Sequence, residues 1–525
     1  MPAAPALVVV VSWPHLYAVN ATQPALSTLL ACSTMTWIRS SVRPAFLWLL
    51  LVCCALSWPS VVVAESGKKP GAAAPSGSTA VLYLRALLDT AAVGPAATYA
   101  RLGLRAGSVV QAFYAQRSFA PAWTHPDSGW NAQATAALTL LGQARQYGLL
   151  PAAYRLPQLQ ALPDSLRLSS KSKDQALQLA GFELRLTDAL VRYAAHLRYG
   201  QLDARTLTAA TLEGAAGQEA TALLEQALAA ESFAPAFLRC QPRSRAYLRL
   251  QQAWGQTLAM PDSVPHGGNE ADFRRVAVNL ERLRWESTTA DTAEYALVNI
   301  PAFRLQLIRG GRVVQTHRVV VGKPETPTPT LNSRLIVFVT APDWRVPYSI
   351  AVNEMLPQLQ EDPSYLYDNH YRLYDYRNRL VNPWNVRWHT ITPEKFPYTI
   401  KQTAGRHNAL GNIVFYFPNQ HTVFLHDTPA RSLFQKSQRA LSHGCVRVEK
   451  PLALAAYLLQ RENQQAALPI VKRSIAQQDK CRFDLARGLP IQIRYYTCEA
   501  DNGRLRFYAD VYCQDEPILA ALLDQ

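Results

Sequence analysis

The residues best suited to covalent chemistry lie in two short segments, Phe424-Leu-His-Asp-Thr-Pro429 and Ser442-His-Gly-Cys-Val-Arg447. A free thiol, with a pKa of about 8.5, is mostly protonated at neutral pH, so a nucleophilic cysteine needs a neighbouring base or cation. His426 can take the proton of Cys445 and later deliver it to a leaving amine. The two segments therefore predict nucleophilic catalysis by Cys445 with His426 as its base.

The neighbours of these two residues suit the same reaction. Gly444 removes a side chain beside the nucleophile, so that a substrate can reach backbone N–H groups that stabilise an oxyanion. The backbone carbonyl of Asp427 is expected to orient the His426 ring. Arg447 alternates with Cys445 along an expected strand and shares its face, where a guanidinium can bind a carboxylate with two hydrogen bonds.

Two strands are expected to carry the site. His426 ends an apolar strand at 422–426, and Cys445 begins another at 445–448. A helix at 451–460 follows, with Pro451 at a first position where a missing N–H costs little. If the two strands are neighbours in a sheet, the thiol and the imidazole meet although a loop separates them in the chain.

Zinc binding by His426, His443 and Cys445 is the main alternative chemistry. The spacing lacks the paired Cys-x-x-Cys or His-x-x-x-His forms that are typical of zinc sites. Cysteine nucleophilic catalysis is therefore favoured, and we expect neither a metal ion nor a cofactor.

At these residues the sequence resembles the signature of L,D-transpeptidases with a YkuD-type catalytic domain. Flanking segments resemble the large, multidomain YcbB-like branch: Val278-Asn-Leu-Glu-Arg-Leu-Arg-Trp285, Trp344-Arg-Val-Pro347, Glu354-Met-Leu-Pro357, Gly405-Arg-His-Asn-Ala-Leu-Gly411 and Leu425-His-Asp-Thr-Pro429. The similarity covers about residues 272–515. It reaches the preceding half only weakly, through Phe113-Tyr114 and Ala122-Trp123.

The resemblance implies a role for each matching residue. Cys445 would be the acylated nucleophile and His426 its base, with His443 completing the catalytic set. Substrate binding would fall to a second group: Arg447, Gly444, Ser442, Asp427, Phe424 and Trp344. The partners would be peptidoglycan stem peptides. A tetrapeptide stem would acylate the cysteine with loss of its terminal D-Ala, and a second stem would then join third residue to third residue.

Such enzymes are typically acylated by carbapenems as well. Two other functions stay open from the sequence: a carboxypeptidase or hydrolase that uses the same thioester with water, and a non-catalytic protein that binds the cell wall.

The expected fold class is α+β, with an N-terminal helical scaffold domain and a mostly β catalytic domain that contains an inserted capping subdomain. The scaffold domain is expected at 81–262. Apolar residues at helical spacing indicate a helix within it, and Gly200 is a plausible end of that helix; these residues are Leu186, Leu190, Tyr193 and Leu197. A connecting helix is expected within 263–294. The catalytic domain is expected at 295–515, with a Gly310-Gly311 hairpin near its start and an aromatic-rich capping insertion at 345–400 that opens with a helix at 349–360.

The first 64 residues predict export. Arg39 and Arg43 precede an apolar run at 45–56, and small residues follow up to Ala64, which is typical of a secretory signal peptide. Met35 would then be a natural start. An uncleaved anchor at 44–64 is the alternative, because that stretch is about long enough to span a bilayer. Residues 65–80 read as a flexible linker. The body is expected in the periplasm or cell envelope, free or anchored to the inner membrane.

The charge balance gives a further hint about partners. The chain has 53 Lys and Arg against 38 Asp and Glu, a net charge of +15, which favours an anionic partner such as a membrane surface or an acidic wall polymer. The cations are spread along the chain without a nucleic-acid-binding motif, so no nucleic acid is expected.

Five cysteines follow residue 64, so at least one must remain unpaired if disulfides form after export. They are Cys240, Cys445, Cys481, Cys498 and Cys513. Cys498 and Cys513 are the local candidates for a disulfide.

Overall fold

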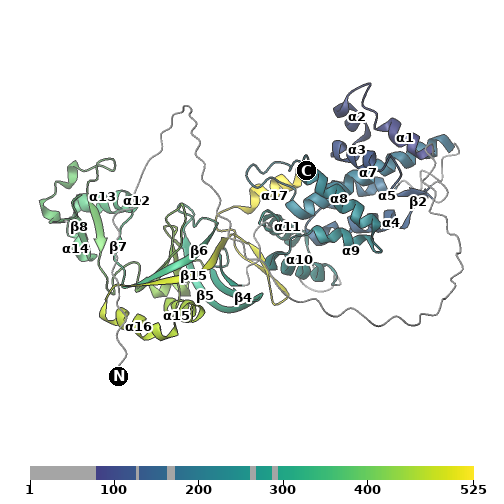
Figure 1. Ribbon diagram of the computed structural model, residues 1–525. Coiled ribbons are helices and arrows are strands. Elements are labelled where there is room, and N and C mark those ends of the chain that lie inside the picture. The colour runs from purple at the N-terminus through teal and green to yellow at the C-terminus, as the bar shows by residue number, and fades with distance from the viewer. Residues whose placement is uncertain (1–78, 126–128, 162–171, 261–267, 287–293, 525) are drawn as a thin grey trace, which may run out of the picture. The chain divides into compact units, whose positions relative to one another are not determined.

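The structure is a computed structural model that describes residues 79–125, 129–161, 172–260, 268–286 and 294–524 (Figure 1). The expected signal or anchor at 1–64 and nearly all of the linker lie outside these ranges. In the ranges that are described, no helix has both the length and the apolar character needed to cross a membrane.

Helices dominate the N-terminal half of the described chain. They are α1 (Thr79–Leu87), α2 (Pro95–Leu102), α3 (Gly107–Gln116), α4 (Ala132–Gly142), α5 (Leu156–Gln160), α7 (Ser172–Tyr199), α8 (Ala215–Ala229), α9 (Phe233–Phe237) and α10 (Arg245–Leu258). The long helix α7 buries the predicted stripe of Leu186, Leu190, Tyr193 and Leu197 in the core of this half. Gly200 follows it with a φ of 98°, a conformation that favours glycine.

A buried carboxylate on α7 joins two distant segments of the helical half. Glu183 is 1% exposed and accepts hydrogen bonds from the backbone N–H groups of Ala122 at 2.9 Å, Trp123 at 2.8 Å and Thr124 at 2.6 Å. It also accepts one from the Tyr114 hydroxyl at 2.6 Å. The two segments with weak resemblance to the family, Phe113-Tyr114 and Ala122-Trp123, therefore both contact the Glu183 side chain. The half is not wholly helical, because two-residue strands β1 (Thr124–His125) and β2 (Gly129–Trp130) pair here.

The expected connecting helix is α11 (Glu270–Trp285), and it contacts both halves of the chain. Asn279 donates from Nδ2 to the Thr497 hydroxyl at 2.8 Å and accepts from the Thr497 N–H at 3.0 Å. Glu281 accepts from the N–H groups of Gln201 at 2.5 Å and Leu202 at 2.8 Å. Asn279 and Glu281 are therefore buried and paired rather than solvated.

Eight strands close into a barrel in the C-terminal half. They are β5 (Arg312–Gly322), β14 (Val446–Val448), β12 (Leu425–His426), β11 (Ile413–Tyr416), β6 (Leu331–Thr340), β15 (Cys481–Arg494), β3 (Glu294–Asn299) and β4 (Arg304–Arg309), in spatial order, and β4 pairs with β5 to complete the ring. β13 (Ala440–Ser442) adds to β5 in parallel. Gly310 and Gly311, with φ of 55° and 71°, form the predicted hairpin turn between β4 and β5.

The barrel core is apolar, and two helices that follow β14 in the sequence pack against it. Leu305, Phe338, Phe415, Leu425 and Val446 are fully buried in it. The helix predicted at 451–460 is α15 (Pro451–Arg461), and α16 (Leu468–Gln477) follows. The long strand β15, the hairpin of β16 (Cys498–Asp501) and β17 (Arg504–Phe507), and helix α17 (Asp515–Leu523) were not predicted individually.

The segment between β6 and β11 has its own small sheet and its own apolar core. The sheet order is β7 (Trp344–Arg345), β10 (Thr399–Gln402), β8 (Tyr371–Tyr374) and β9 (Leu380–Val381). The predicted helix at 349–360 is present as α12 (Tyr348–Ile350), a π-helical turn (Ala351–Met355) and α13 (Leu356–Glu361), and α14 (Tyr365–Asp368) follows. Met355, Leu359, Leu373 and Ile400 are buried in the core of this segment.

The five cysteines in the described residues are all unpaired. The disulfide considered for Cys498 and Cys513 is not formed. Cys498 lies on β16, buried in the apolar cluster with α10 and α11, whereas Cys513 is exposed. Proximity in the sequence was therefore no guide to pairing, because β16 turns its cysteine inward.

Candidate active site

The site rests on a pair of parallel strands, β12 and β14, inside the mostly antiparallel barrel. Leu425 is opposite Val446 and His426 is opposite Arg447. Leu425 and Val446 fill the barrel core. Because side chains alternate along a strand, His426 and Arg447 lie on the other face. Cys445 directly precedes β14, and its thiol lies close enough to Arg447 for the guanidinium to affect its pKa.

His426 has a defined tautomer and a depressed basicity. Its Nδ1 lies 2.5 Å from the Asp427 backbone carbonyl oxygen, so Nδ1 carries the proton and donates. The other ring nitrogen, Nε2, is then the basic one. Burial, reinforced by the nearby Arg447 guanidinium, lowers the pKa of His426 to about 3. The carbonyls of Asp427 and Leu410 oppose this shift only partly. The resting imidazole is therefore neutral, with the proton on Nδ1 and none on Nε2.

Cys445 is partly exposed and sits at the entry to β14. Burial raises the pKa of its thiol, while the Phe424 backbone N–H and the Arg447 guanidinium lower it to a smaller extent. The thiol is thus protonated at rest, and the pair with His426 is a neutral one. Such a pair reaches the thiolate by proton transfer during the attack.

The loop that presents Cys445 is held by the side chain of Ser442. The buried Ser442 hydroxyl donates to the Cys445 carbonyl at 2.5 Å and accepts from the Gly444 N–H at 3.2 Å. Gly444 has a φ of 108°, which favours glycine. In the part of the chain that the structure describes, the Cys445 N–H has no acceptor. That N–H, rather than the occupied Gly444 N–H, is available to an oxyanion.

A second loop, which follows β5, supports the first, and no local sequence pattern indicates this support. The buried Thr328 hydroxyl donates to the Gly444 carbonyl at 2.8 Å, and the Thr326 hydroxyl donates to the Ser442 carbonyl at 3.2 Å. Tyr512, close to the C-terminus, donates to the Gly322 carbonyl at 2.7 Å and accepts from the Thr328 N–H at 3.2 Å. Only a structure shows these contacts, because they join segments over 100 residues apart.

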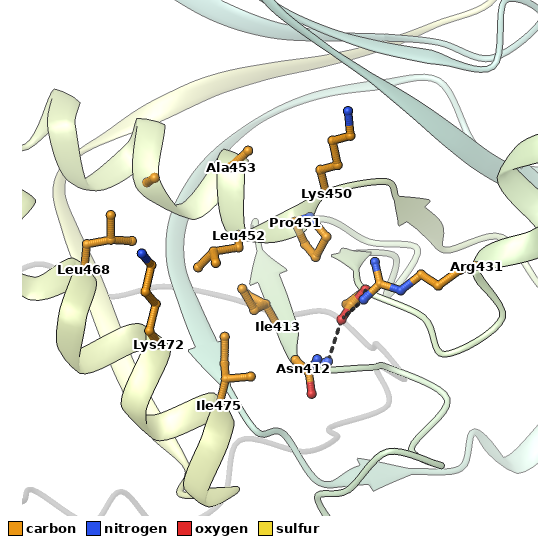
Figure 2. Close-up of a pocket in the computed structure, with 12 residues that line it drawn as sticks. Asn412, Ile413, Arg431, Lys450, Pro451, Leu452, Ala453, Leu468, Lys472 and Ile475 are labelled. Atoms are coloured by element: carbon orange, nitrogen blue, oxygen red, sulfur yellow. Dashed lines mark hydrogen bonds and ion pairs between the residues drawn. The ribbon is translucent and has the colours of Figure 1, made fainter.

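The Asp427 side chain is anchored by several hydrogen bonds, and its backbone carbonyl orients the His426 imidazole. Its carboxylate is fully buried and accepts from the Asn412 N–H at 2.8 Å, from the Thr428 N–H at 2.7 Å and from Arg431 at 2.7 and 3.0 Å. Figure 2 shows the Asn412 and Arg431 contacts at the rim of a cavity of about 590 Å³ next to α15 and α16. Burial raises the pKa of Asp427 despite these partners. The carboxylate fixes the backbone whose carbonyl holds His426.

Arg447 has no ion pair with an acidic side chain among the described residues, and its guanidinium is partly buried. Its Nε is buried and lacks a hydrogen-bond partner there. Burial lowers the pKa of the guanidinium, and Cys445 opposes the shift. An unpaired guanidinium beside the thiol is suited to a carboxylate. Phe424 flanks the imidazole, with ring centroids 5.7 Å apart.

The other two predicted residues lie toward the inserted segment. His443 Nε2 is 2.6 Å from Glu354 Oε1, on the π-helical turn. Trp344 lies on β7, and the centroids of its ring and the Tyr371 ring are 6.1 Å apart, within the apolar cluster of the insertion. The structure thus links His443 to the insertion and places Trp344 within it.

The described residues contain no group of three His, Cys, Asp or Glu side chains that could hold a metal ion. His443 faces Glu354, while His426 directs Nδ1 to a backbone carbonyl.

Two family models match the chain. Residues 108–253 match the scaffold domain, and residues 293–471 match the L,D-transpeptidase catalytic domain, YkuD. The chain has an L,D-transpeptidase catalytic domain. The match covers the strands that carry Phe424, His426, Cys445 and Arg447, and the scaffold domain precedes it as predicted.

A relative from Haemophilus influenzae, named "Putative L,D-transpeptidase", is 33% identical over 262 residues. The match spans 50% of this chain and 52% of the relative, so about half of each protein is compared.

Two solved structures are also similar to this chain. An L,D-transpeptidase from Mycobacterium smegmatis is 14% identical, with 38% of this chain and 58% of that chain covered and a TM-score of 0.18. L,D-transpeptidase 1 from Mycobacterium tuberculosis is 12% identical, with 38% and 61% covered and a TM-score of 0.15. The assignment rests on the domain matches and not on these distant structures.

Proposed function

We propose that this protein cross-links peptidoglycan stem peptides between their third residues, through a thioester on Cys445. The observation that carries the proposal is the shared face of β12 and β14, with a neutral imidazole and a thiol flanked by an unpaired guanidinium. The catalytic domain match gives the reaction class, and the geometry supports the residue roles.

In the first half-reaction, the sulfur attacks the carbonyl carbon between the third residue and the terminal D-Ala of a tetrapeptide stem. The thiol proton passes to Nε2 of His426, whose Nδ1–H stays on the Asp427 carbonyl. The Cys445 N–H stabilises the oxyanion. Nε2 then protonates the leaving amine, the C–N bond breaks, and D-Ala departs. Arg447 is placed to bind the D-Ala carboxylate.

In the second half-reaction, an amine of another stem attacks the thioester. His426 accepts a proton from that amine, the C–S bond breaks, and the proton returns to the sulfur. The product is an amide between two stems, and the thiol is restored. Ser442, Thr326 and Thr328 act by holding the loop at Cys445 in place.

Incubation of the purified protein with tetrapeptide muropeptides tests the proposal. Cross-linked dimers and free D-Ala are expected, and Cys445→Ala should abolish both. Monomeric tripeptide as the sole product would show a carboxypeptidase instead. Intact mass after carbapenem exposure adds a second readout: an adduct that Cys445→Ala removes is expected, and a folded protein without any adduct would favour a non-catalytic wall-binding role.

We further propose that the chain works in the cell envelope, by way of a signal peptide or an anchor within residues 1–64. The family of the catalytic domain and the sequence of that segment support this location. N-terminal sequencing of the protein from the envelope fraction is expected to begin after Ala64 if a signal peptide is cleaved. An intact N-terminus in the membrane fraction would favour the anchor, and recovery from the cytoplasm would contradict both.

A further inference from the structure

A small cavity in the helical half is lined by three arginines. They are Arg155, directly before α5, and Arg185 and Arg192, both on α7 (Figure 1). The cavity has a volume of about 110 Å³, the room that about three or four water molecules take at about 30 Å³ each. Arg192 is 5% exposed, whereas Arg155 and Arg185 are exposed. The cavity therefore suits a small anionic group that enters from the solvent.

Among the described residues, one acidic side chain, Asp188, lines the cavity. Its Oδ1 accepts a hydrogen bond from the Ala106 N–H at 2.6 Å, and its Oδ2 lies 3.6 Å from Nη1 of Arg192. That second distance is too long for a hydrogen bond, and Arg192 donates instead from Nη2 to the Ala153 carbonyl at 2.7 Å. With three arginines and one aspartate, the lining has a net charge of +2.

The two exposed arginines have hydrogen-bond donors to spare. Arg155 donates from Nη1 to the Gly103 carbonyl at 3.0 Å, and neither it nor Arg185 pairs with an acid in the described part of the chain. Gly103 leaves room for Arg155, because a Cβ there would lie 2.4 Å from Nη1. Burial, followed by the charge of Arg155, lowers the pKa of the Arg185 guanidinium. Two like charges are thus held close together, and an anion between them would relieve their repulsion.

The charge and the chemistry of the lining favour a phosphoryl group. A guanidinium binds the oxygens of a phosphate with two parallel N–H···O bonds. A carboxylate would offset one of the two excess charges. A phosphate monoester offsets both, because its second pKa is about 6 and it carries close to two negative charges above pH 7. The rest of such a molecule would extend past Arg155 and Arg185 into the solvent.

We propose that Arg155, Arg185 and Arg192 form a binding site for a dianionic phosphoryl group, either inorganic phosphate or the terminal phosphate of a phosphate monoester. All three arginines lie within the residues that match the scaffold domain. The site makes no use of Cys445 or His426, so it stands or falls separately from the proposed function. It gives the helical half a ligand to bind in addition to its role in packing.

Calorimetric titration of the purified protein with inorganic phosphate at about pH 8 and constant ionic strength tests the site. One phosphate per chain is expected to bind, with a Kd of about 1 mM or tighter. Arg185→Gln should weaken binding by at least about tenfold, because it removes charged hydrogen-bond donors. Arg185→Lys should fall between the two, because an ammonium keeps the charge but lacks the planar pair of donors. The matched control, Arg205→Gln, changes an exposed arginine of the same half outside the cavity and should bind as the wild type does.

Thermal midpoints without phosphate show whether each variant is folded. If Arg185→Gln does not fold, Arg155→Gln takes its place with the same expected loss of affinity. Three results would each overturn the inference: no saturable binding of phosphate, equal weakening by Arg205→Gln and Arg185→Gln, or acetate bound as tightly as phosphate.

Two further probes identify what carries the phosphoryl group. Glycerol 3-phosphate, bound by the wild type and bound less tightly by Arg185→Gln, would support a soluble monoester. Flotation with phosphatidylcholine vesicles that contain phosphatidic acid, but not with phosphatidylcholine alone, would support a lipid headgroup if Arg185→Gln abolishes it. Binding of inorganic phosphate without either of these would identify the free anion as the ligand.

Discussion

At the scale of single residues, the thiol of Cys445 and the imidazole of His426 form a neutral resting pair. Burial raises the pKa of the thiol and lowers that of the imidazole, so the thiolate is scarce at neutral pH. The rate of alkylation of Cys445 by iodoacetamide should therefore rise with pH up to at least about 9, because only the thiolate reacts. Peptide mass mapping of Cys445 measures this rate separately from the rates of the other cysteines.

Arg447→Gln should move the same alkylation profile to higher pH, because the guanidinium lowers the pKa of the thiol. Lys472→Gln, an exposed cation on α16, is the control and should leave the profile in place. A rate that is constant between about pH 6 and 8 would instead indicate a preformed thiolate–imidazolium pair, contrary to the neutral pair inferred here.

At the scale of elements, the buried carboxylate of Glu183 holds the segment at 122–124 against α7. Glu183→Ala would leave several buried donors unsatisfied, at about 1–3 kcal/mol each, so the local free energy of opening should fall by about 3 kcal/mol or more. Faster hydrogen exchange at the amides of Ala122, Trp123 and Thr124 measures this loss. Glu225→Gln breaks a partly exposed ion pair with Arg117 and should change exchange at those amides little. Unchanged exchange in Glu183→Ala would show that the segment is held by other contacts.

The elements also show what the sequence could and could not predict. Alternation predicted that Cys445 and Arg447 share a face; the register of β12 with β14 places Arg447 opposite His426, and Cys445 comes just before β14. The strand expected at 422–426 is shorter, because Thr422 has a φ of 53° and the Asn419 side chain binds the backbone of Val423. The supports at Thr328 and Tyr512, and the acid at Glu354, were missed because a tertiary contact between distant segments leaves no local pattern. The catalytic and binding roles stay predictions until they are measured.

At the scale of the whole molecule, both halves bury neutral histidines, and the C-terminal half buries His317 besides His426. Burial lowers the pKa of His196 on α7 and of His426 on β12 to about 3. The unfolded chain, with a histidine pKa of about 6.5, binds protons between about pH 6.5 and 3 that the folded chain does not. The contribution of each buried histidine to the free energy of unfolding is therefore fully present above about pH 6.5. It should decrease as the pH falls below that value, by up to about 1.4 kcal/mol per pH unit for each histidine.

Thermal midpoints between pH 7.5 and 4.5 measure this dependence. His196→Gln and His426→Gln should each flatten the decrease relative to the wild type, whereas the exposed His389→Gln should not. Buried carboxyl groups also change the pH dependence of stability: the raised pKa of Glu281 makes the folded chain more stable as the pH falls. Comparison of the variants with the wild type separates the effect of each histidine from this opposite effect. Equal slopes in all four proteins would contradict the buried neutral state of both histidines.

The parallel pairing of β12 with β14 has a consequence for a newly made chain. A parallel pair cannot form by a simple hairpin, so residues 427–445 must cross over before the two strands align, and β14 also needs β5 on its other side. Arg447 comes to lie opposite His426, next to Cys445, only when this crossover is complete. If Cys445 acts as proposed, acyl transfer can begin only after β14 has aligned with β12 and β5.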